Sequence, residues 1–266
     1  MKIRPSHIQR RKQADKIVCL TAYSAPMARL LDPICDVLLV GDSLGMVVYG
    51  MENTLGVTLD MMIAHGKAVA SHAARACVVV DLPYGTYEEA PDQALSTARH
   101  MMDESGCDAV KLEGGAAMAD TIAHLVQNDI PVMGHIGLLP QSVEKDGGYK
   151  VQGKSTDSAD DLRHDLDAIT DAGAFSVVIE GTIESVSRDL SAHAKIPTIG
   201  IGASLACDGQ ILVTGDMLGL HGTNVPKFVK RYAALDEVIS DSAQAFADDV
   251  RGGRFPNDDY TYKRKP

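Results

Sequence analysis

Short apolar runs recur along the chain, and four of them end in an acidic residue followed by a turn. The four runs and their acids are residues 37–40 with Asp42, residues 78–80 with Asp81, residues 109–112 with Glu113, and residues 177–179 with Glu180. The runs are mostly β-branched and do not alternate with polar residues, which is typical of strands buried on both faces of a parallel sheet. We therefore expect these strands to bring their acids to one common rim.

The same pattern predicts eight strands, mostly separated by helices. The predicted strands are residues 17–21, 37–40, 77–81, 109–113, 131–136, 176–180, 197–201 and 210–213. Apolar residues at helical spacing, with Ser24 and Thr58 as N-caps, predict helices. These cover residues 24–32, 58–74, 91–104, 118–127, 159–172, 183–193 and 233–250. Residues 1–15 are expected to form a short helix or arm, residues 138–158 a polar loop and residues 258–266 a charged tail.

Eight parallel strands are the number that closes a barrel, so the predicted fold class is α/β, a (β/α)8 TIM barrel. No linker, repeat or low-complexity tract divides the chain. We therefore expect residues 1–266 to form a single barrel domain with an N-terminal arm and a C-terminal helix and tail. In such barrels the catalytic groups lie at the C-terminal ends of the strands. An open doubly wound sheet also binds ligands at its strand ends and remains the alternative.

Composition narrows the class of protein further. The chain has 266 residues, a formal net charge of −11 and five scattered cysteines with no C-x-x-C pair. An acidic chain without a basic tract is not expected to bind nucleic acid or an anionic membrane. The cysteines are typical of reduced thiols, and no apolar run has the length of a signal or membrane segment. We therefore expect a cytoplasmic protein.

Asp42, Asp81 and Glu113 end strands that are neighbours in a barrel. Like charges in one pocket repel, so this cluster requires a cation or raised pKa values. Oxygen ligands without a histidine or thiol partner favour Mg²⁺, and we predict a Mg²⁺ site on these three acids. A single acid of this kind is better explained as a loop cap or as the partner of a base.

Four further side chains have predicted roles around this site. Lys111 lies two residues before Glu113 and points to the same face, where it binds a substrate carboxylate, neutralises the acids, or does both. Ser43 flanks the site, and His135 is either a hydrogen-bond donor to the substrate or a structural histidine. Glu180, across the barrel, is the predicted general base. A metal facing a base suits removal of the proton beside the carbonyl of a 2-oxo acid, because the metal stabilises the enolate.

Residues 148–155 (GYKVQGKS) match the phosphate-binding pattern G-x-x-x-x-G-K-[ST]. That motif requires a strand directly before it and a helix directly after it. The preceding residues 141–147 are not a buried strand, and we expect Thr156, Asp157 and Ser158 to delay the next helix. A mobile lid over the barrel mouth is therefore the preferred interpretation, with nucleotide binding as a rival.

Several longer motifs resemble one known family. They are GDSLGM at 41–46, DLPYG at 81–85, VKLEGG at 110–115, MGHIGL at 133–138, residues 148–154, IPTIGIGA at 196–203 and DGQILV at 208–213. In order and spacing, residues 20–219 resemble the ketopantoate hydroxymethyltransferases. Ser24 and Ser204 depart from the pattern, which has Asp and Gly at these positions.

The resemblance implies a barrel of the phosphoenolpyruvate/pyruvate type with Mg²⁺ at Asp42, Asp81 and Glu113 and with Glu180 as the base. The implied substrate contacts come from Asp42, Ser43, Asp81, Lys111 and His135. The implied reaction transfers a one-carbon unit from 5,10-methylenetetrahydrofolate to 3-methyl-2-oxobutanoate, giving 2-dehydropantoate for pantothenate synthesis. The resemblance also implies a large homo-oligomer, a decamer-like ring. Another Mg²⁺-dependent carbon–carbon lyase acting on a 2-oxo acid and a catalytically silent scaffold barrel remain alternatives.

Overall fold

A computed structural model describes residues 1–145, 147–222 and 225–263. The chain divides into two compact units, Met1–Thr214 and Gly215–Pro266. The expectation of one barrel domain over residues 1–266 stays a prediction. The predicted polar loop is described except for residue 146, and the predicted charged tail is described up to residue 263; its last three residues lie outside the described part.

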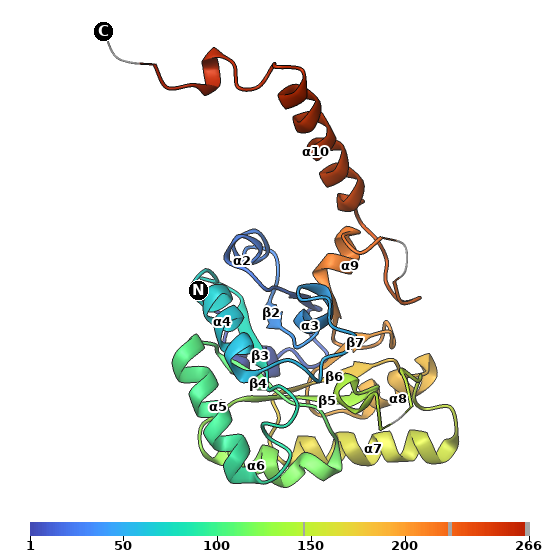
Figure 1. The fold of residues 1–266 in the computed structure, drawn as a ribbon. Helices are drawn as coiled ribbons and strands as arrows, with labels where there is room; N and C mark the ends of the chain where they lie inside the picture. The colour runs from blue at the N-terminus through green and yellow to red at the C-terminus, as the bar shows by residue number, and fades with distance from the viewer. Residues whose placement is uncertain (146, 223–224, 264–266) are drawn as a thin grey trace. The chain divides into compact units, whose positions relative to one another are not determined.

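The first unit is a closed barrel of eight parallel strands in sequence order, with β8 paired to β1 (Figure 1). The strands are β1 (Ile17–Thr21), β2 (Val37–Val40), β3 (Cys77–Asp81), β4 (Ala109–Lys111), β5 (Val132–Gly137), β6 (Ser176–Glu180), β7 (Thr198–Ile201) and β8 (Gly209–Leu212). Their short, uniformly apolar sequences suit burial on both faces, inside the barrel and beneath the surrounding helices. The barrel prediction is therefore confirmed over the open sheet.

The pleat of the strands sorts the buried side chains into two clusters. Leu38 and Val78 belong to the cluster that packs against the helices, whereas Val37 and Val79 belong to the cluster inside the barrel. Because side chains alternate along a strand, every second residue continues the inward series. On β3 this series runs from Cys77 to Val79 and ends at Asp81, so the same periodicity that fills the core directs a carboxylate to the barrel mouth.

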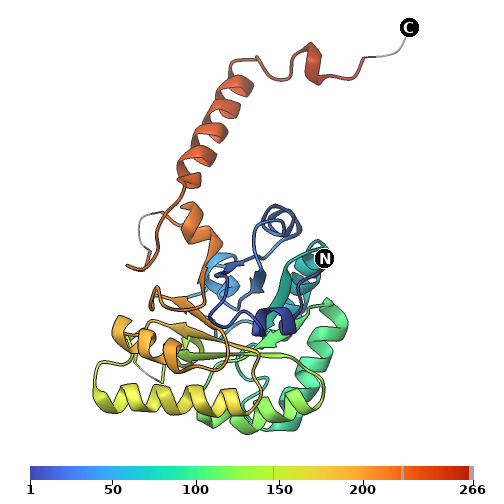
Figure 2. The ribbon, with the colours of Figure 1, turned by 180° about the vertical axis from the view of Figure 1, so that it is seen from behind.

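Helices surround the barrel. They are α2 (Ala25–Leu31), α3 (Leu44–Val47), α4 (Leu59–Ala70), α5 (Pro91–Ser105), α6 (Ala119–Gln127), α7 (Thr156–Asp171) and α8 (Glu184–His193). Figures 1 and 2 show α5, α6 and α7 following one another along the outside of the sheet, and neighbouring helices contact each other from α4 to α8. The short α1 (Pro5–Gln9) brings Ile8 into the interior cluster, so the leading arm closes the N-terminal end of the barrel.

The structure differs from the sequence prediction in several places, and α4, predicted to extend to residue 74, ends at Ala70. The fourth strand ends at Lys111, two residues earlier than predicted, although Leu112 N–H still donates to Met133 O. α7 begins at Thr156 instead of residue 159, because Ser155 Oγ accepts a 3.2 Å hydrogen bond from Ser158 N and caps the helix. The short α3 and α9 (Thr214–Leu218) have no counterpart in the sequence prediction.

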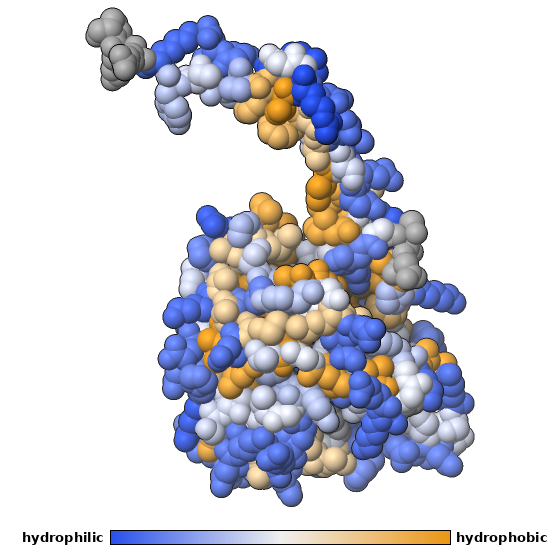
Figure 3. Space-filling view, viewed as in Figure 1, coloured by the Kyte–Doolittle hydropathy of each residue, from blue (hydrophilic) through white to orange (hydrophobic). Residues whose placement is uncertain are grey.

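The second unit consists mainly of α10 (Leu235–Arg251), with a 3₁₀ turn at Asp258–Tyr260. α10 has no buried residue, and Figure 3 shows hydrophobic residues gathered along it. Its largest exposed apolar side chains are Val238, Ile239, Phe246 and Val250, each about half exposed. Within the described ranges, no helix combines the length and apolar character needed to cross a membrane.

Candidate active site

The predicted acids and the lysine meet at the C-terminal end of the barrel. Asp81 and Lys111 are register partners on β3 and β4, and their side chains form a buried ion pair with 3.0 Å between Lys111 Nζ and Asp81 Oδ1. Asp42 follows β2 by two residues, and its backbone N–H donates to Asp81 Oδ2 at 3.1 Å. All three side chains are less than 5% exposed. The structure thus brings together residues that lie far apart in the sequence.

Gln141, which no sequence pattern indicates, joins two of the acids. Its Nε2 donates to Asp42 Oδ2 at 2.7 Å, and its backbone N–H donates to Glu113 Oε2 at 2.9 Å. Tyr87 OH in turn donates to Gln141 Oε1 at 2.5 Å. Both residues lie in loops, where no periodic pattern indicates which side chains point inward, so the sequence held no signal for them.

His135 lies between the lysine and the predicted base. Lys111 Nζ is 3.3 Å from His135 Nδ1, and His135 Nε2 is 3.2 Å from Glu180 Oε2, although the angle of the second contact is poor for a hydrogen bond. An ammonium group only donates, so Nδ1 is the accepting nitrogen and Nε2 carries the proton that faces Glu180. The imidazole thus has protein groups on both sides, and its contact with a substrate stays a prediction.

Gly137 allows β5 and β6 to end close together beside Glu180. Its φ is +96°, a region that side chains rarely adopt, and a Cβ atom there would lie 2.3 Å from Glu180 O. Leu138 N–H donates to the same carbonyl at 2.9 Å. Glycine is therefore required at this position to let the backbone turn where the predicted base is held.

Ser43 also reaches the barrel mouth, where its Oγ is 2.8 Å from Tyr23 OH. Tyr23 follows β1 and is a further residue that sequence reasoning did not assign to the site. Burial raises the pKa of the Tyr23 phenol, so the phenol is neutral and available as a hydrogen-bond partner of Ser43.

The acid cluster carries more negative charge than Lys111 balances. Burial, together with the charge of Asp81, raises the pKa of Asp42 to about 7. Burial and the charge of Asp42 raise the pKa of Glu113 well above its ordinary value, although Lys111 opposes the shift. Burial alone would lower the pKa of Lys111, but the surrounding acids, Asp81 first, raise it. Burial and the charge of Lys111 lower the pKa of His135, so its imidazole is neutral.

This surplus charge and the oxygen-rich donor set fit a hard divalent cation. Carboxylates are the ligands that Mg²⁺ prefers, and a second positive charge would relieve the repulsion that raises the pKa values of Asp42 and Glu113. In the part of the chain that the structure describes, no three His, Cys, Asp or Glu side chains are already arranged around one point to hold a metal. Lys111 Nζ and Asp42 N–H already contact the two oxygens of Asp81, and Gln141 Nε2 contacts Asp42 Oδ2. A cation would therefore bind through the other carboxylate oxygens of the cluster or after these contacts shift.

The segment that matches the phosphate-binding pattern does not have the structure of a phosphate loop. The expected delay before the next helix is wrong, since α7 begins directly after Ser155. However, no strand directly precedes the segment among the described residues, and a 3₁₀ turn stands at Pro140–Ser142. The backbone N–H groups of Gln152 and Gly153 already donate to Gly181 O and Ser158 Oγ. A phosphate would have no free donors from these two residues, so nucleotide binding is disfavoured.

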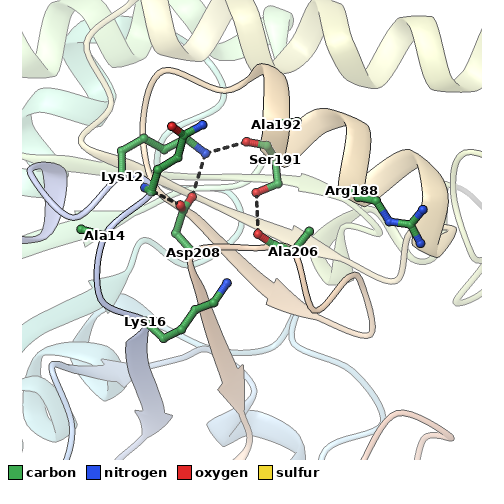
Figure 4. A pocket seen from close by; sticks show the side chains of 9 residues that line it. Lys12, Ala14, Lys16, Arg188, Ser191, Ala192, Ala206 and Asp208 are labelled. Carbon is green, nitrogen blue, oxygen red and sulfur yellow. Dashed lines mark hydrogen bonds and ion pairs between the residues drawn. The ribbon is translucent and has the colours of Figure 1, made fainter.

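A separate hollow of about 290 Å³ lies at the N-terminal end of the barrel, away from the acids (Figure 4). Lys12 Nζ donates to Asp208 Oδ2 at 2.9 Å and to Ser191 O at 2.6 Å, and Lys16 Nζ donates to Cys207 O at 2.6 Å. These ammonium groups are occupied by protein partners. The hollow therefore reflects how the N-terminal arm is attached and is not included in the candidate active site.

Residues 2–258 match the sequence profile of ketopantoate hydroxymethyltransferase. The chain belongs to the ketopantoate hydroxymethyltransferase family. A 3-methyl-2-oxobutanoate hydroxymethyltransferase from Rhizobium etli is 57% identical over 265 residues, which cover 100% of this chain and 97% of that protein. The enzyme of the same name from Brucella canis is 55% identical over 265 residues, covering 100% and 96% of the two chains.

Solved structures support the fold of this family member. A 2,3-dimethylmalate lyase, described as a PEP mutase/isocitrate lyase superfamily member, superposes with a TM-score of 0.62 at 18% identity over 98% of this chain and 89% of that chain. A phosphoenolpyruvate phosphomutase from Streptomyces platensis subsp. rosaceus has a TM-score of 0.62 at 14% identity, covering 98% and 92%. The predicted fold class and the predicted family are both confirmed.

The two departures from the ketopantoate hydroxymethyltransferase pattern have local structural roles. Ser24 is the N-cap of α2, and its Oγ accepts a 3.5 Å hydrogen bond from Met27 N. Ser204 Oγ donates to Glu184 Oε1 at 2.8 Å and accepts from Ala206 N at 3.1 Å. Both serines therefore bond locally, and these contacts do not involve the acid cluster.

Proposed function

We propose that this hydroxymethyltransferase moves a one-carbon unit from 5,10-methylenetetrahydrofolate to 3-methyl-2-oxobutanoate, yielding 2-dehydropantoate for pantothenate synthesis. The observation that carries the proposal is the grouping of Asp81, Lys111, His135 and Glu180 at one barrel mouth in a member of this family. This grouping places a positively charged lysine, an acid cluster and the proposed carboxylate base at one end of the barrel.

The proposed roles follow from charge and contacts. Asp42, Asp81 and Glu113 would hold Mg²⁺, which supplies Lewis-acid stabilisation of the negative charge that develops on the 2-oxo acid. Lys111 provides a fixed positive charge for the substrate carboxylate. Glu180 is on β6, away from the ion pair, and keeps a lone pair available to take the C3 proton.

The remaining polar groups at the barrel mouth would orient the substrate. Ser43 and Asp42 flank the end of β2, and Asp81 faces them from β3. The neutral His135 places its Nε2 3.2 Å from Glu180 Oε2, which keeps the imidazole beside the predicted base. Together with Lys111, these groups would fix the 2-oxo acid with its C3 proton towards the base, the arrangement that proton transfer requires.

We further propose that the enzyme forms a homo-oligomer. The apolar side chains of α10 are spaced along one stripe at positions 235, 239, 246 and 250. None of them is fully buried, although Phe255 packs edge-on against Phe246. An exposed stripe of this length on an amphipathic helix is typical of a protein interface. The five free, buried cysteines support a reducing, cytoplasmic location, and the acidic charge disfavours nucleic acid and membrane partners.

The test is proton NMR of 3-methyl-2-oxobutanoate in D₂O with the enzyme and Mg²⁺. We expect loss of the C3 proton signal, prevented by a chelator. Addition of 5,10-methylenetetrahydrofolate should then give 2-dehydropantoate. Exchange without this product would favour the alternative, a carbon–carbon lyase that forms the same enolate without folate. No exchange under either condition would contradict the proposed substrate and base.

A further inference from the structure

We propose that Gln141 is a positioning residue that sets the carboxylates of Asp42 and Glu113 for the metal. The inference rests on the proposed Mg²⁺ site. Gln141 is 6% exposed, and its amide NH₂, its amide oxygen and its backbone N–H together make four hydrogen bonds. Gln141 is therefore a neutral hydrogen-bond partner shared by two acids that follow different strands.

The first set of contacts fixes the two acids relative to each other. Gln141 Nε2 divides its two hydrogens between Asp42 Oδ2 at 2.7 Å and Leu82 O at 3.0 Å. The backbone N–H of the same residue donates to Glu113 Oε2 at 2.9 Å. Each acid therefore has one oxygen held by Gln141, which restricts the directions in which its other oxygen can point.

Tyr87 fixes which way the amide of Gln141 points. The hydroxyl of Tyr87 donates to Gln141 Oε1 at 2.5 Å and accepts from the backbone N–H of Glu113 at 3.2 Å. An amide turned by 180° would place its oxygen against Asp42 Oδ2 and its NH₂ against a hydroxyl that already accepts from Glu113 N–H, so one orientation suits both ends best. Glu113, Tyr87 and Gln141 are connected in a closed ring of hydrogen bonds, in which the Tyr87 hydroxyl accepts one bond and donates the next.

A neutral amide suits this position better than a charged group. A basic side chain would add a second cation beside Lys111 and reduce the charge that attracts a metal. A further acid would add to the repulsion that already raises the pKa of Asp42. Gln141 supplies hydrogen-bond donors without changing the charge of the site.

The position of Gln141 in the chain connects the acids to the following loop. The residue lies in the 3₁₀ turn Pro140–Ser142, shortly before the segment that is predicted to act as a lid. Tyr149 in that segment contacts Met46 Sδ through its hydroxyl at 3.6 Å. Burial raises the pKa of Tyr149, and the charges of Glu180, Asp42 and Glu113 add to the shift.

The experiment measures binding of Mn²⁺ alone by electron paramagnetic resonance, using wild-type enzyme, Gln141→Met and Tyr87→Phe. Methionine keeps the volume of glutamine but makes none of its side-chain hydrogen bonds, and phenylalanine removes only the hydroxyl. The matched control is Gln93→Met, because the Gln93 amide bonds to backbone groups outside the site, Gly85 O and Glu89 N. Loss of a partner that orients metal ligands typically weakens metal binding by about 10–100-fold.

We expect the Mn²⁺ dissociation constant to rise by about 10–100-fold in Gln141→Met, to rise less in Tyr87→Phe and to stay unchanged in Gln93→Met. The Mg²⁺ concentration at half-maximal rate should rise in parallel, while the rate at saturating Mg²⁺ recovers. If wild-type enzyme binds Mn²⁺ and both variants bind it equally well, with only a lower melting temperature, Gln141 is structural and the inference is wrong. If wild-type enzyme binds no Mn²⁺, the proposed metal site itself fails, and the inference fails with it. If Gln141→Met does not fold, the Mn²⁺ dissociation constant of Tyr87→Phe alone tests the inference.

Discussion

Asp81 and Lys111 are opposite each other on adjacent strands, and their side chains form an ion pair of 3.0 Å inside the barrel mouth. Strand register brings these two side chains together, because residues directly opposite each other on neighbouring parallel strands point to the same face of the sheet. Removing Asp81 takes away the nearest counter-charge of the buried Lys111 and leaves the other acids of the cluster to balance it. This loss is more costly than losing an exposed ion pair.

Asp81→Asn is therefore expected to affect both catalysis and stability. The amide cannot neutralise Lys111 or bind a cation as a carboxylate does, so Mg²⁺-dependent product formation should fall by about 100-fold or more. The free energy of unfolding should fall by about 3 kcal/mol, with an unchanged far-UV circular dichroism spectrum. Asp103→Asn, an exposed position on α5, is the control. Full activity in Asp81→Asn would contradict its role at the metal.

Glu180→Gln should separate substrate binding from proton removal. The variant keeps the size of the side chain but cannot take a proton, so C3 exchange in D₂O should slow by about 10²–10⁴-fold. Binding of 3-methyl-2-oxobutanoate, measured by calorimetry, should change little, because Lys111 and the acids across the barrel are intact. Exchange at the wild-type rate would remove Glu180 as the base.

The loop over residues 147–155 is predicted to close over bound ligand. Gly147, Gly148 and Gly153 all have positive φ values, and Tyr149 and Val151 are about half exposed. Tryptic cleavage after Lys150 and Lys154 should be about tenfold slower with 3-methyl-2-oxobutanoate and Mg²⁺ than without them, because ordering the loop lowers the population of its open form.

Cleavage after Lys195, exposed between α8 and β7, serves as the internal reference for this comparison. Its rate should not depend on ligand. Equal protection at all three lysines, or at none of them, would count against a lid.

Phe246→Asp should weaken self-association. Phe246 is 57% exposed on α10, and a carboxylate in the proposed apolar interface would be buried without a partner. The molar mass from size-exclusion chromatography with light scattering should fall relative to wild type at equal concentration. Gln244→Asp, on the polar side of the same helix, should keep the wild-type mass. A monomeric wild-type protein would contradict the proposed homo-oligomer.

Asp208 should contribute stability that depends on pH. Burial alone would raise its pKa, but hydrogen bonds from Lys12, Thr198 N and Gln13 N lower it below the ordinary value. A group with a depressed folded-state pKa stabilises the protein above its unfolded pKa, and the contribution is lost as pH falls through the folded-state pKa.

Asp208→Asn should accordingly lower the free energy of unfolding by about 1.5–3 kcal/mol near neutral pH, since charge-assisted hydrogen bonds are lost. In urea titrations the difference from wild type should begin to shrink below about pH 4, the ordinary pKa of an aspartate, and continue to shrink as the wild-type carboxylate becomes protonated. Asp15→Asn, exposed on the N-terminal arm that Asp208 contacts, is the control. A difference that does not depend on pH would mean that the charge of Asp208 is unimportant.

The sequence predicts the strands well because each is a short apolar run closed by a turn, and β2, β3 and β6 begin and end where the pattern places them. Strand ends also point to Asp81 and Glu180, whose direction follows from alternation along the strand. Gln141 and Tyr87 were missed because loop side chains have no such periodicity, and their contacts depend on the path of the backbone. α7 starts before the predicted position because Ser155 caps it, and apolar spacing alone does not indicate such a cap.

The alternation inside the barrel has a consequence for redesign. On β3, Cys77, Val79 and Asp81 form one inward series, so deleting a single residue within that strand would turn the carboxylate outward and bring an intervening valine into the interior. Strand length is therefore fixed by chemistry as well as by packing. Attempts to change the accepted substrate are better directed at the connections that follow the strands, where length and composition vary without reversing which side chains face the cavity.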